Sequence, residues 1–212
     1  MTPRVLLLAL ACSAAAFPAP RLFFSKYFKG SVPEYVATTV EQDGAVTFQT
    51  AMDDPDPLKF KLDPARTQEM FDLASKLDHF QHPIESGLKI ANLGAKTFRF
   101  ENGSEKHQVE FNFSEDPNAQ ALLDQFEEIT ETEQHFIDLD RTVHFDKLGV
   151  NDVLLQLEAT WDRKRLVAPE QFLPLLDRIA KNESFLHLAR ERAAAIAEAI
   201  RKPPTPSPEK TQ

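Results

Sequence analysis

Two short segments place histidine near carboxylates at spacings that could support metal binding or proton transfer. His79 and His82 lie three residues apart, with Asp78 beside them, and Asp140 and His144 lie four residues apart. On a helix, side chains at either spacing project from one face, so each pair could contribute to a divalent metal site. His144 could also act as a general base, with Asp140 as the carboxylate that orients it.

A structural role is nevertheless the favoured interpretation of both pairs. Pro83 directly follows the first pair, which puts His79 and His82 at an expected helix end, where the helix dipole and solvent also favour histidine. The second pair has the spacing of an ordinary solvated ion pair on a charged helix. We therefore expect no cofactor, and we keep the four residues as a candidate metal site.

Carboxylates are concentrated between residues 115 and 140, a stretch with nine Asp or Glu and no Lys or Arg. It lacks the glycine and the alternation of a calcium-binding loop. Helical spacing favours a solvated face, with docking of a basic partner as the functional alternative. A second cluster at residues 53–56 contains proline and is typical of a rigid turn.

The motifs of several enzyme classes are missing from the sequence. It has no Gly-x-Ser-x-Gly, no glycine-rich phosphate loop, no His-Glu-x-x-His and no dinucleotide fingerprint. Glycine is scarce, at 6 of 212 residues, and Cys12 is the single cysteine, which excludes a disulfide framework and a multi-thiolate metal site. The missing motifs and the scarcity of glycine therefore argue against an enzyme.

Alternating apolar residues predict an antiparallel sheet of about four or five strands with one buried face and one wet face. Asp43-Gly44 and Asn102-Gly103 supply the tight turns of two hairpins. We expect strands at 35–40, 46–50, 58–62, 98–100 and 109–113.

Helices are predicted in two groups. Asp63-Pro64 and Asp116-Pro117 each place an N-cap carboxylate before a proline at the first helical position. Apolar stripes follow both, so these two helices should cover the sheet. Further stripes at 150–161, 169–179 and 185–200 predict a C-terminal helical bundle. The expected fold class is α+β.

The distribution of charge suggests how the chain is divided. It carries 24 Lys and Arg against 33 Asp and Glu, a formal charge of −9. Residues 17–145 have 12 basic and 23 acidic side chains, whereas 146–202 have 10 and 9, so we place the boundary between a sheet domain and a helical subdomain near 145. Residues 203–212 contain four prolines and should form a disordered tail. A net acidic chain is not expected to bind nucleic acid.

The first sixteen residues have the layout of a secretory signal. Arg4 precedes the apolar run 5–11, and Ala14 and Ala16 satisfy the small-x-small rule for cleavage after residue 16. In the alternative, Leu10-Ala11-Cys12 resembles a bacterial lipobox, although Ala9 stands where leucine is usual, and Cys12 would be lipidated. An uncleaved anchor is a third possibility, but the run is short for one. The mature chain should be periplasmic or secreted, or lipid-anchored in the envelope through Cys12.

A basic and aromatic cluster follows the signal, where Lys26-Tyr27-Phe28-Lys29 adjoins Phe23 and Phe24. It could contact a membrane surface or nucleic acid, or its aromatic rings could pack on the core. The acidic charge of the chain favours the second interpretation.

The sequence is thus interpreted as an exported, non-enzymatic binding protein of the bacterial envelope or exterior, whose acidic sheet half meets a basic partner or ligand. A membrane would be contacted only through a lipidated N-terminus. The alternatives are a metal-dependent hydrolase that uses the histidine and aspartate pairs, and a structural lipoprotein held through Cys12. The partner, the oligomeric state and the strand order do not follow from the sequence.

Overall fold

The computed structural model describes residues 19–202, so Cys12, the expected signal and the proline-rich tail lie outside it. The described residues form an α+β fold with a six-stranded antiparallel sheet and five α-helices, as predicted in class and with one strand more than expected. The sheet order is β4-β3-β2-β1-β5-β6. The strands are β1 (Arg21–Tyr27), β2 (Tyr35–Glu41), β3 (Ala45–Gln49), β4 (Leu58–Lys61), β5 (Ala95–Asn102) and β6 (Glu105–Phe111).

The strand that the sequence did not reveal is β1, which lies in the middle of the sheet between β2 and β5. Its core face carries Leu22, Phe24 and Lys26, so a lysine interrupts the apolar series, and Phe23 adds an aromatic ring on the other face. Phe24 is fully buried and its ring stacks on Phe126 at 4.9 Å between centroids. The expectation that aromatic residues here pack on the core is therefore correct for Phe24 and wrong for Tyr27 and Phe28, which are exposed.

Both predicted N-caps are present. Asp63 accepts a hydrogen bond from the backbone N–H of Arg66 at 2.9 Å, and Asp116 accepts one from Asn118 at 2.7 Å. The helix predicted from the stripe at 169–179 begins later than that stripe. Its first residues form a 3-10 turn, η2 (Pro169–Phe172), and the α-helix starts at Leu173, next to Pro174. The helices are α1 (Pro64–Lys76), α2 (Pro117–Phe145), α3 (Val150–Asp162), α4 (Leu173–Lys181) and α5 (His187–Arg201), with a 3-10 turn η1 (Asp78–Phe80) after α1.

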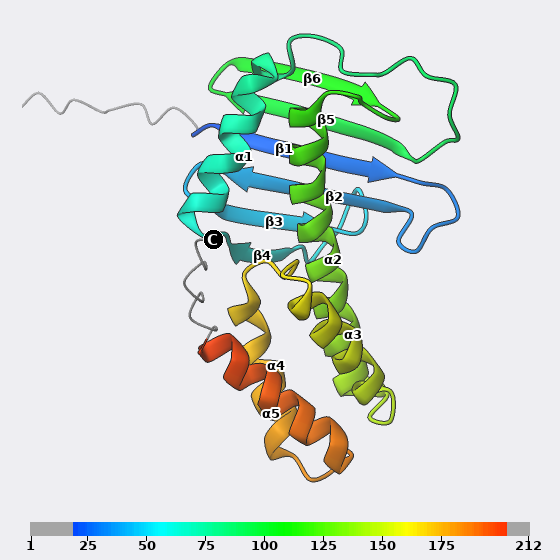
Figure 1. Cartoon of the computed structure of the whole chain (residues 1–212), viewed down its shortest axis with the longest axis vertical. Helices are drawn as coiled ribbons and strands as arrows, with labels where there is room; N and C mark the ends of the chain where they lie inside the picture. Colours follow the sequence, from blue (N-terminus) through cyan, green and yellow to red (C-terminus); the bar gives the residue numbers. More distant parts are fainter. Residues whose placement is uncertain (1–18, 203–212) are drawn as a thin grey trace, which may run out of the picture.

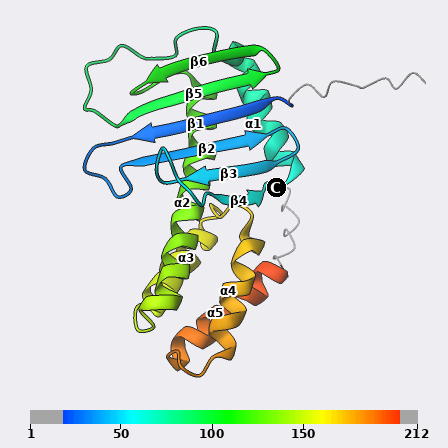
Figure 2. The same ribbon diagram turned by 180° about the vertical axis from the view of Figure 1, so that it is seen from behind.

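α1 and α2 cross one face of the sheet, as predicted, and α2 continues past β4 into the helical bundle (Figure 1). Seen from behind, the opposite face of the sheet carries no helix formed by residues 19–202 (Figure 2). The side chains of this uncovered face are mostly polar, as in the row Thr39, Thr47, Lys59 and Gln108 that crosses it beside Phe23. The guanidinium of Arg99 lies over the Phe23 ring, 3.9 Å from its centroid. A helix is not needed there because few apolar side chains require burial.

Two hydrophobic cores share α2. Leu122, Phe126 and Ile129 pack in the first core, beneath the sheet, with residues of α1. Leu139 and Val143, further along the same helix, pack in the second core with residues of α3, α4 and α5. The two cores therefore meet along a continuous helix rather than across a loop.

At this junction the chain after α3 is fastened to α2 by buried polar contacts. The Thr132 hydroxyl accepts a hydrogen bond from the backbone N–H of Val167 at 3.0 Å. Gln171 Nε2 donates to Glu133 Oε1 at 2.9 Å, while Glu133 Oε2 is buried without a hydrogen-bond partner in the described part of the chain. Burial raises the pKa of Glu133 to about 7, although the Gln171 hydrogen bond acts in the opposite direction.

Glu133 should make the free energy of unfolding depend on pH. Its folded pKa of about 7 lies above the ordinary 4.5, so the folded state holds this proton more tightly and loses stability as pH rises through that interval. We expect Glu133→Gln to remove this loss. The free energy of unfolding of the variant, relative to that of the natural chain, should be about 3 kcal/mol higher at pH 8 than at pH 4.5. Denaturant unfolding at both pH values measures it. The control is Glu170→Gln at an exposed position of η2; an equal pH response in both variants would contradict the assignment.

Candidate functional site

The first histidine pair does not converge. α1 ends at Lys76, and Asp78, His79 and Phe80 all take positive φ, so the backbone turns where a longer helix would have kept the pair on one face. The His79 ring lies against Phe100, 4.2 Å between centroids, whereas His82 Nε2 lies 3.1 Å from Asp78 Oδ2. The two rings therefore have separate partners.

Asp140 and His144 do share a continuous helix, α2. His144 Nδ1 lies 2.8 Å from the backbone oxygen of Asp140 and 3.5 Å from its carboxylate, and its Nε2 faces Arg178 Nη1 at 3.2 Å. Arg178 thus takes the position where a metal ion would approach. Across residues 19–202, no group of three or more His, Cys, Asp or Glu is placed to hold a metal ion.

The acidic stretch forms much of α2, and cations from distant parts of the chain pair with its middle. Arg66 Nη1 lies 2.6 Å from Glu128 Oε2. Arg165 contacts Asp124 at 3.0 Å and Glu131 at 3.1 Å. Part of the acidity that the sequence assigned to a solvated face therefore fastens α2 to α1 and to the segment before η2.

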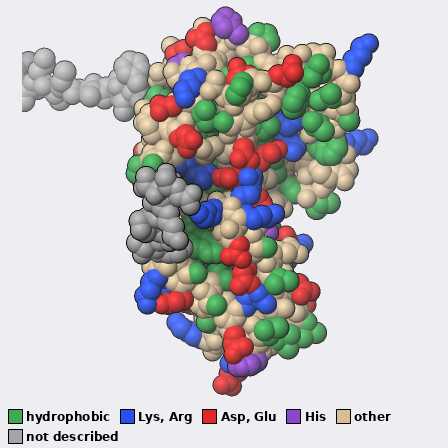
Figure 3. All heavy atoms as spheres, viewed as in Figure 1, with side chains coloured by type: hydrophobic (Ala, Val, Ile, Leu, Met, Phe, Trp, Pro, Cys, Tyr) green, Lys and Arg blue, Asp and Glu red, His purple; other side chains and the backbone are tan. Residues whose placement is uncertain are grey.

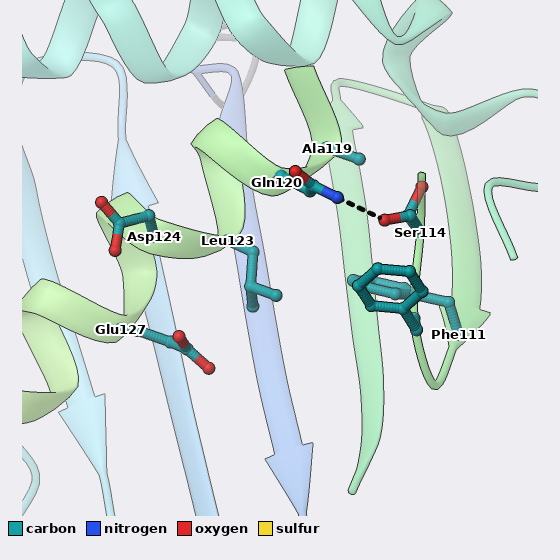
Figure 4. Close-up of a pocket in the computed structure, with 8 residues that line it drawn as sticks. Phe111, Ser114, Ala119, Gln120, Leu123, Asp124 and Glu127 are labelled. Carbon is teal, nitrogen blue, oxygen red and sulfur yellow. Dashed lines mark hydrogen bonds between the residues drawn. The ribbon is translucent and has the colours of Figure 1, made fainter. Parts of the chain in front are cut away.

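Among residues 19–202, one flank of α2 nevertheless remains open, and three cavities lie along it. The first, of 230 Å³, lies beside the N-terminal turns of α2 and the end of β6. In Figure 4, Leu123 lies between the carboxylates of Asp124 and Glu127 on one side and Phe111 on the other. Gln120 closes one end by donating to the backbone oxygen of Ser114 at 3.0 Å. This cavity combines an apolar wall with a carboxylate rim.

The second cavity, of 210 Å³, lies between α2 and the loop 28–34. Phe28 and Val32 of the loop face Thr130 and Gln134 of the helix across it. Lys26 also lines this cavity, and its Nζ lies 3.2 Å from Glu127 Oε1 in the first cavity. The Lys26–Glu127 ion pair therefore separates the first two cavities.

The third cavity, of 320 Å³, lies between α2 and α3 and shares Gln134 with the second. The hydroxyl of Thr160 at its base donates to Glu131 Oε1 at 3.2 Å and is 2.9 Å from His135 Nε2 and 3.0 Å from Arg163 Nη2. A hydroxyl has one proton to donate, so His135 and Arg163 act as donors to it. His135 is then not a base for Thr160, and the cluster ties α2 to α3.

The three cavities follow one stripe of α2, at Leu123, Glu127, Thr130, Gln134 and Asp138, with the spacing of three and four residues that keeps side chains on one helix face. We call this row of cavities the α2 groove. Counted from Ala119 to Asp138, the α2 residues that line it span twenty residues of helix, or about 30 Å. Its lining includes five carboxylates and two cations, Lys26 and Arg163.

Comparisons of the chain with protein-family models, with curated proteins and with solved structures found no match. Within residues 19–202, no helix has the length and apolarity needed to cross a membrane.

Sequence reasoning identified the acidity of α2 but not the groove. The spacing of the stripe was visible in the sequence, and it could have shown that these residues share a face. The opposite walls come from β6, the loop 28–34 and α3, which only the tertiary fold brings to that face.

The third cavity allows a direct check of its hydrogen bonding. Burial lowers the pKa of His135 below the ordinary 6.5, against the opposing influence of Glu131 and Asp138. We expect its ring to remain neutral at pH 7 and to titrate below 6.5 in an NMR pH series, with proton retention at the nitrogen that faces Thr160. A neutral ring with its proton on Nδ1 would contradict the network described here, and titration at or above 6.5 would contradict the effect of burial.

Proposed function

We propose that this protein is an exported binding protein that holds a basic segment of a partner polypeptide in the α2 groove. The observation that carries the proposal is the first cavity, where apolar walls and two accessible carboxylates lie side by side. Export is supported by the pattern of residues 1–16, which lie outside the described structure.

The chemistry of the first cavity suits an apolar side chain that is flanked by a cation. Leu123 and Phe111 offer apolar walls, and the volume of 230 Å³ admits one aliphatic or aromatic side chain. Asp124 and Glu127 keep 58% and 42% of their side chains exposed. Each carboxylate has lone pairs beyond those used by Arg165 and Lys26, so a lysine or arginine of a partner could add a charge-assisted hydrogen bond.

The length and field of the groove favour an elongated basic partner. An extended polypeptide rises about 3.3 Å per residue, so the 30 Å groove would accept about nine residues. Residues 17–145 carry a net charge of −11, which attracts cationic segments over longer distances and raises the rate of encounter.

Binding can be tested by fluorescence anisotropy with a labelled peptide of about nine alternating lysine and leucine residues. The full chain should bind this peptide and not a glutamate–leucine peptide of equal length. We expect Asp124→Asn with Glu127→Gln to weaken binding at least about tenfold, because two charge-assisted contacts are lost.

The matched control is Glu69→Gln with Asp72→Asn, which removes the same charge from exposed positions of α1. It should change the affinity less than about twofold, the range of a screened long-range effect. Equal weakening by the two double variants would show attraction to total charge alone, and the groove would then not be the site.

Export has its own test, the intact mass of the protein recovered from its native host. The expected mass begins at Phe17 without an adduct. A mass that begins at Cys12 with acyl chains would instead establish the lipoprotein alternative. Recovery of only the unprocessed chain from Met1 would refute export and leave the groove proposal to its own experiment.

A further inference from the structure

A second surface lies at one end of the sheet, where the loops 28–34 and 81–94 both emerge (Figure 1). Six large apolar side chains there are 39% to 98% exposed. We call them the sheet-end patch: Tyr27, Phe28, Val32, Leu88, Ile90 and Leu93. Figure 3 shows hydrophobic side chains gathered at this end of the sheet, with basic side chains projecting beyond them. Exposed apolar surface of this extent usually marks an interaction site.

The loops that carry the patch are anchored to the sheet. Lys96 is almost fully buried, and its Nζ donates to the backbone oxygens of Leu93, Gly94 and Asn112 at 3.3, 3.2 and 2.7 Å. Asn112 Oδ1 also accepts from the backbone N–H of Leu93 at 2.7 Å. Gly94 packs so closely that an added Cβ would lie 3.2 Å from Phe28. The apolar side chains are therefore presented by an ordered scaffold.

The charges of the two loops are arranged asymmetrically. Lys29 and Lys89 are exposed, and neither has a carboxylate within 4.0 Å among residues 19–202. The carboxylates of the same loops bind backbone: Glu34 Oε1 accepts from the N–H of Gly30 at 2.8 Å, and Glu85 Oε2 accepts from that of Asn112 at 2.5 Å. The patch thus presents apolar groups together with unpaired cations.

We propose that the sheet-end patch docks the protein on the surface of an anionic phospholipid bilayer. Aromatic and aliphatic side chains would enter the interfacial region, and Lys29 and Lys89 would contact lipid phosphates. The remainder of the sheet half is acidic, so repulsion from an anionic surface favours the orientation in which this end faces the bilayer. A second copy is a poorer occupant because it would bring the same cations together.

The test is hydrogen–deuterium exchange of the full chain with vesicles of phosphatidylcholine and about 30% phosphatidylglycerol. Residues 28–34 and 81–94 should become protected. The readout is resolved along the chain because the apolar N-terminal run could itself bind vesicles. We expect Leu88→Ser with Ile90→Ser to lower the vesicle affinity read from the protection of these two loops at least about tenfold, and Lys29→Gln with Lys89→Gln to lower it about fivefold per lysine on anionic vesicles.

The control is Phe145→Ser with Leu148→Ser, which removes two exposed apolar side chains at the turn between α2 and α3. Thermal unfolding confirms that each variant is folded. Loop protection that is lost only in the patch variants supports the proposal. The proposal is wrong if neither loop becomes protected, or if the control variant loses loop protection as much as the patch variants do. A concentration-dependent dimer that disappears in the patch variants would also overturn it, since the occupant would then be a second copy.

Discussion

The sharing of one helix between two cores is the constraint on which the rest of the structure depends. α2 has 29 residues and is about 43 Å long, longer than the width of sheet it crosses. Its first turns are held beneath the sheet by Phe126 and its neighbours, and its last turns by Leu139 and Val143 in the bundle. Because α1 covers the sheet on one side of α2, the other flank is left open, and the groove is a consequence of that arrangement.

Local signals predicted much of the fold because the features that produce it are local. Alternation, tight turns and N-cap carboxylates act over a few residues, and they located five strands and the starts of both covering helices. The sequence did not reveal β1 because Lys26 occupies a core-face position, where its long stem reaches from the sheet to Glu127 on α2. Lys26 thus concealed the strand and also lines the α2 groove. Residues that break the sequence pattern of their own strand often belong to functional or strained sites.

The candidate site was less predictable because it depends on pairings between distant segments. Composition showed that α2 is acidic. It did not show that Arg66 and Arg165, which lie 62 and 37 residues from Glu128 along the chain, pair with Glu128 in the middle of the helix. The histidine pairs illustrate the same limit. Three-residue spacing places two side chains on one face only where an α-helix continues through both, and α1 ends at Lys76, before residues 78–80 take positive φ.

The two proposed surfaces are physically connected. Phe28 and Val32 belong to the sheet-end patch and also form one wall of the second cavity of the α2 groove. A bilayer that takes up these side chains would alter that wall, and a polypeptide seated in the groove would alter how the side chains meet lipid. Linkage then requires the two effects to be equal in free energy: if one ligand changes the affinity for the other, the second changes the affinity for the first by the same factor. The loop 28–34 is therefore the element through which occupancy of the groove and attachment to a membrane would be coupled.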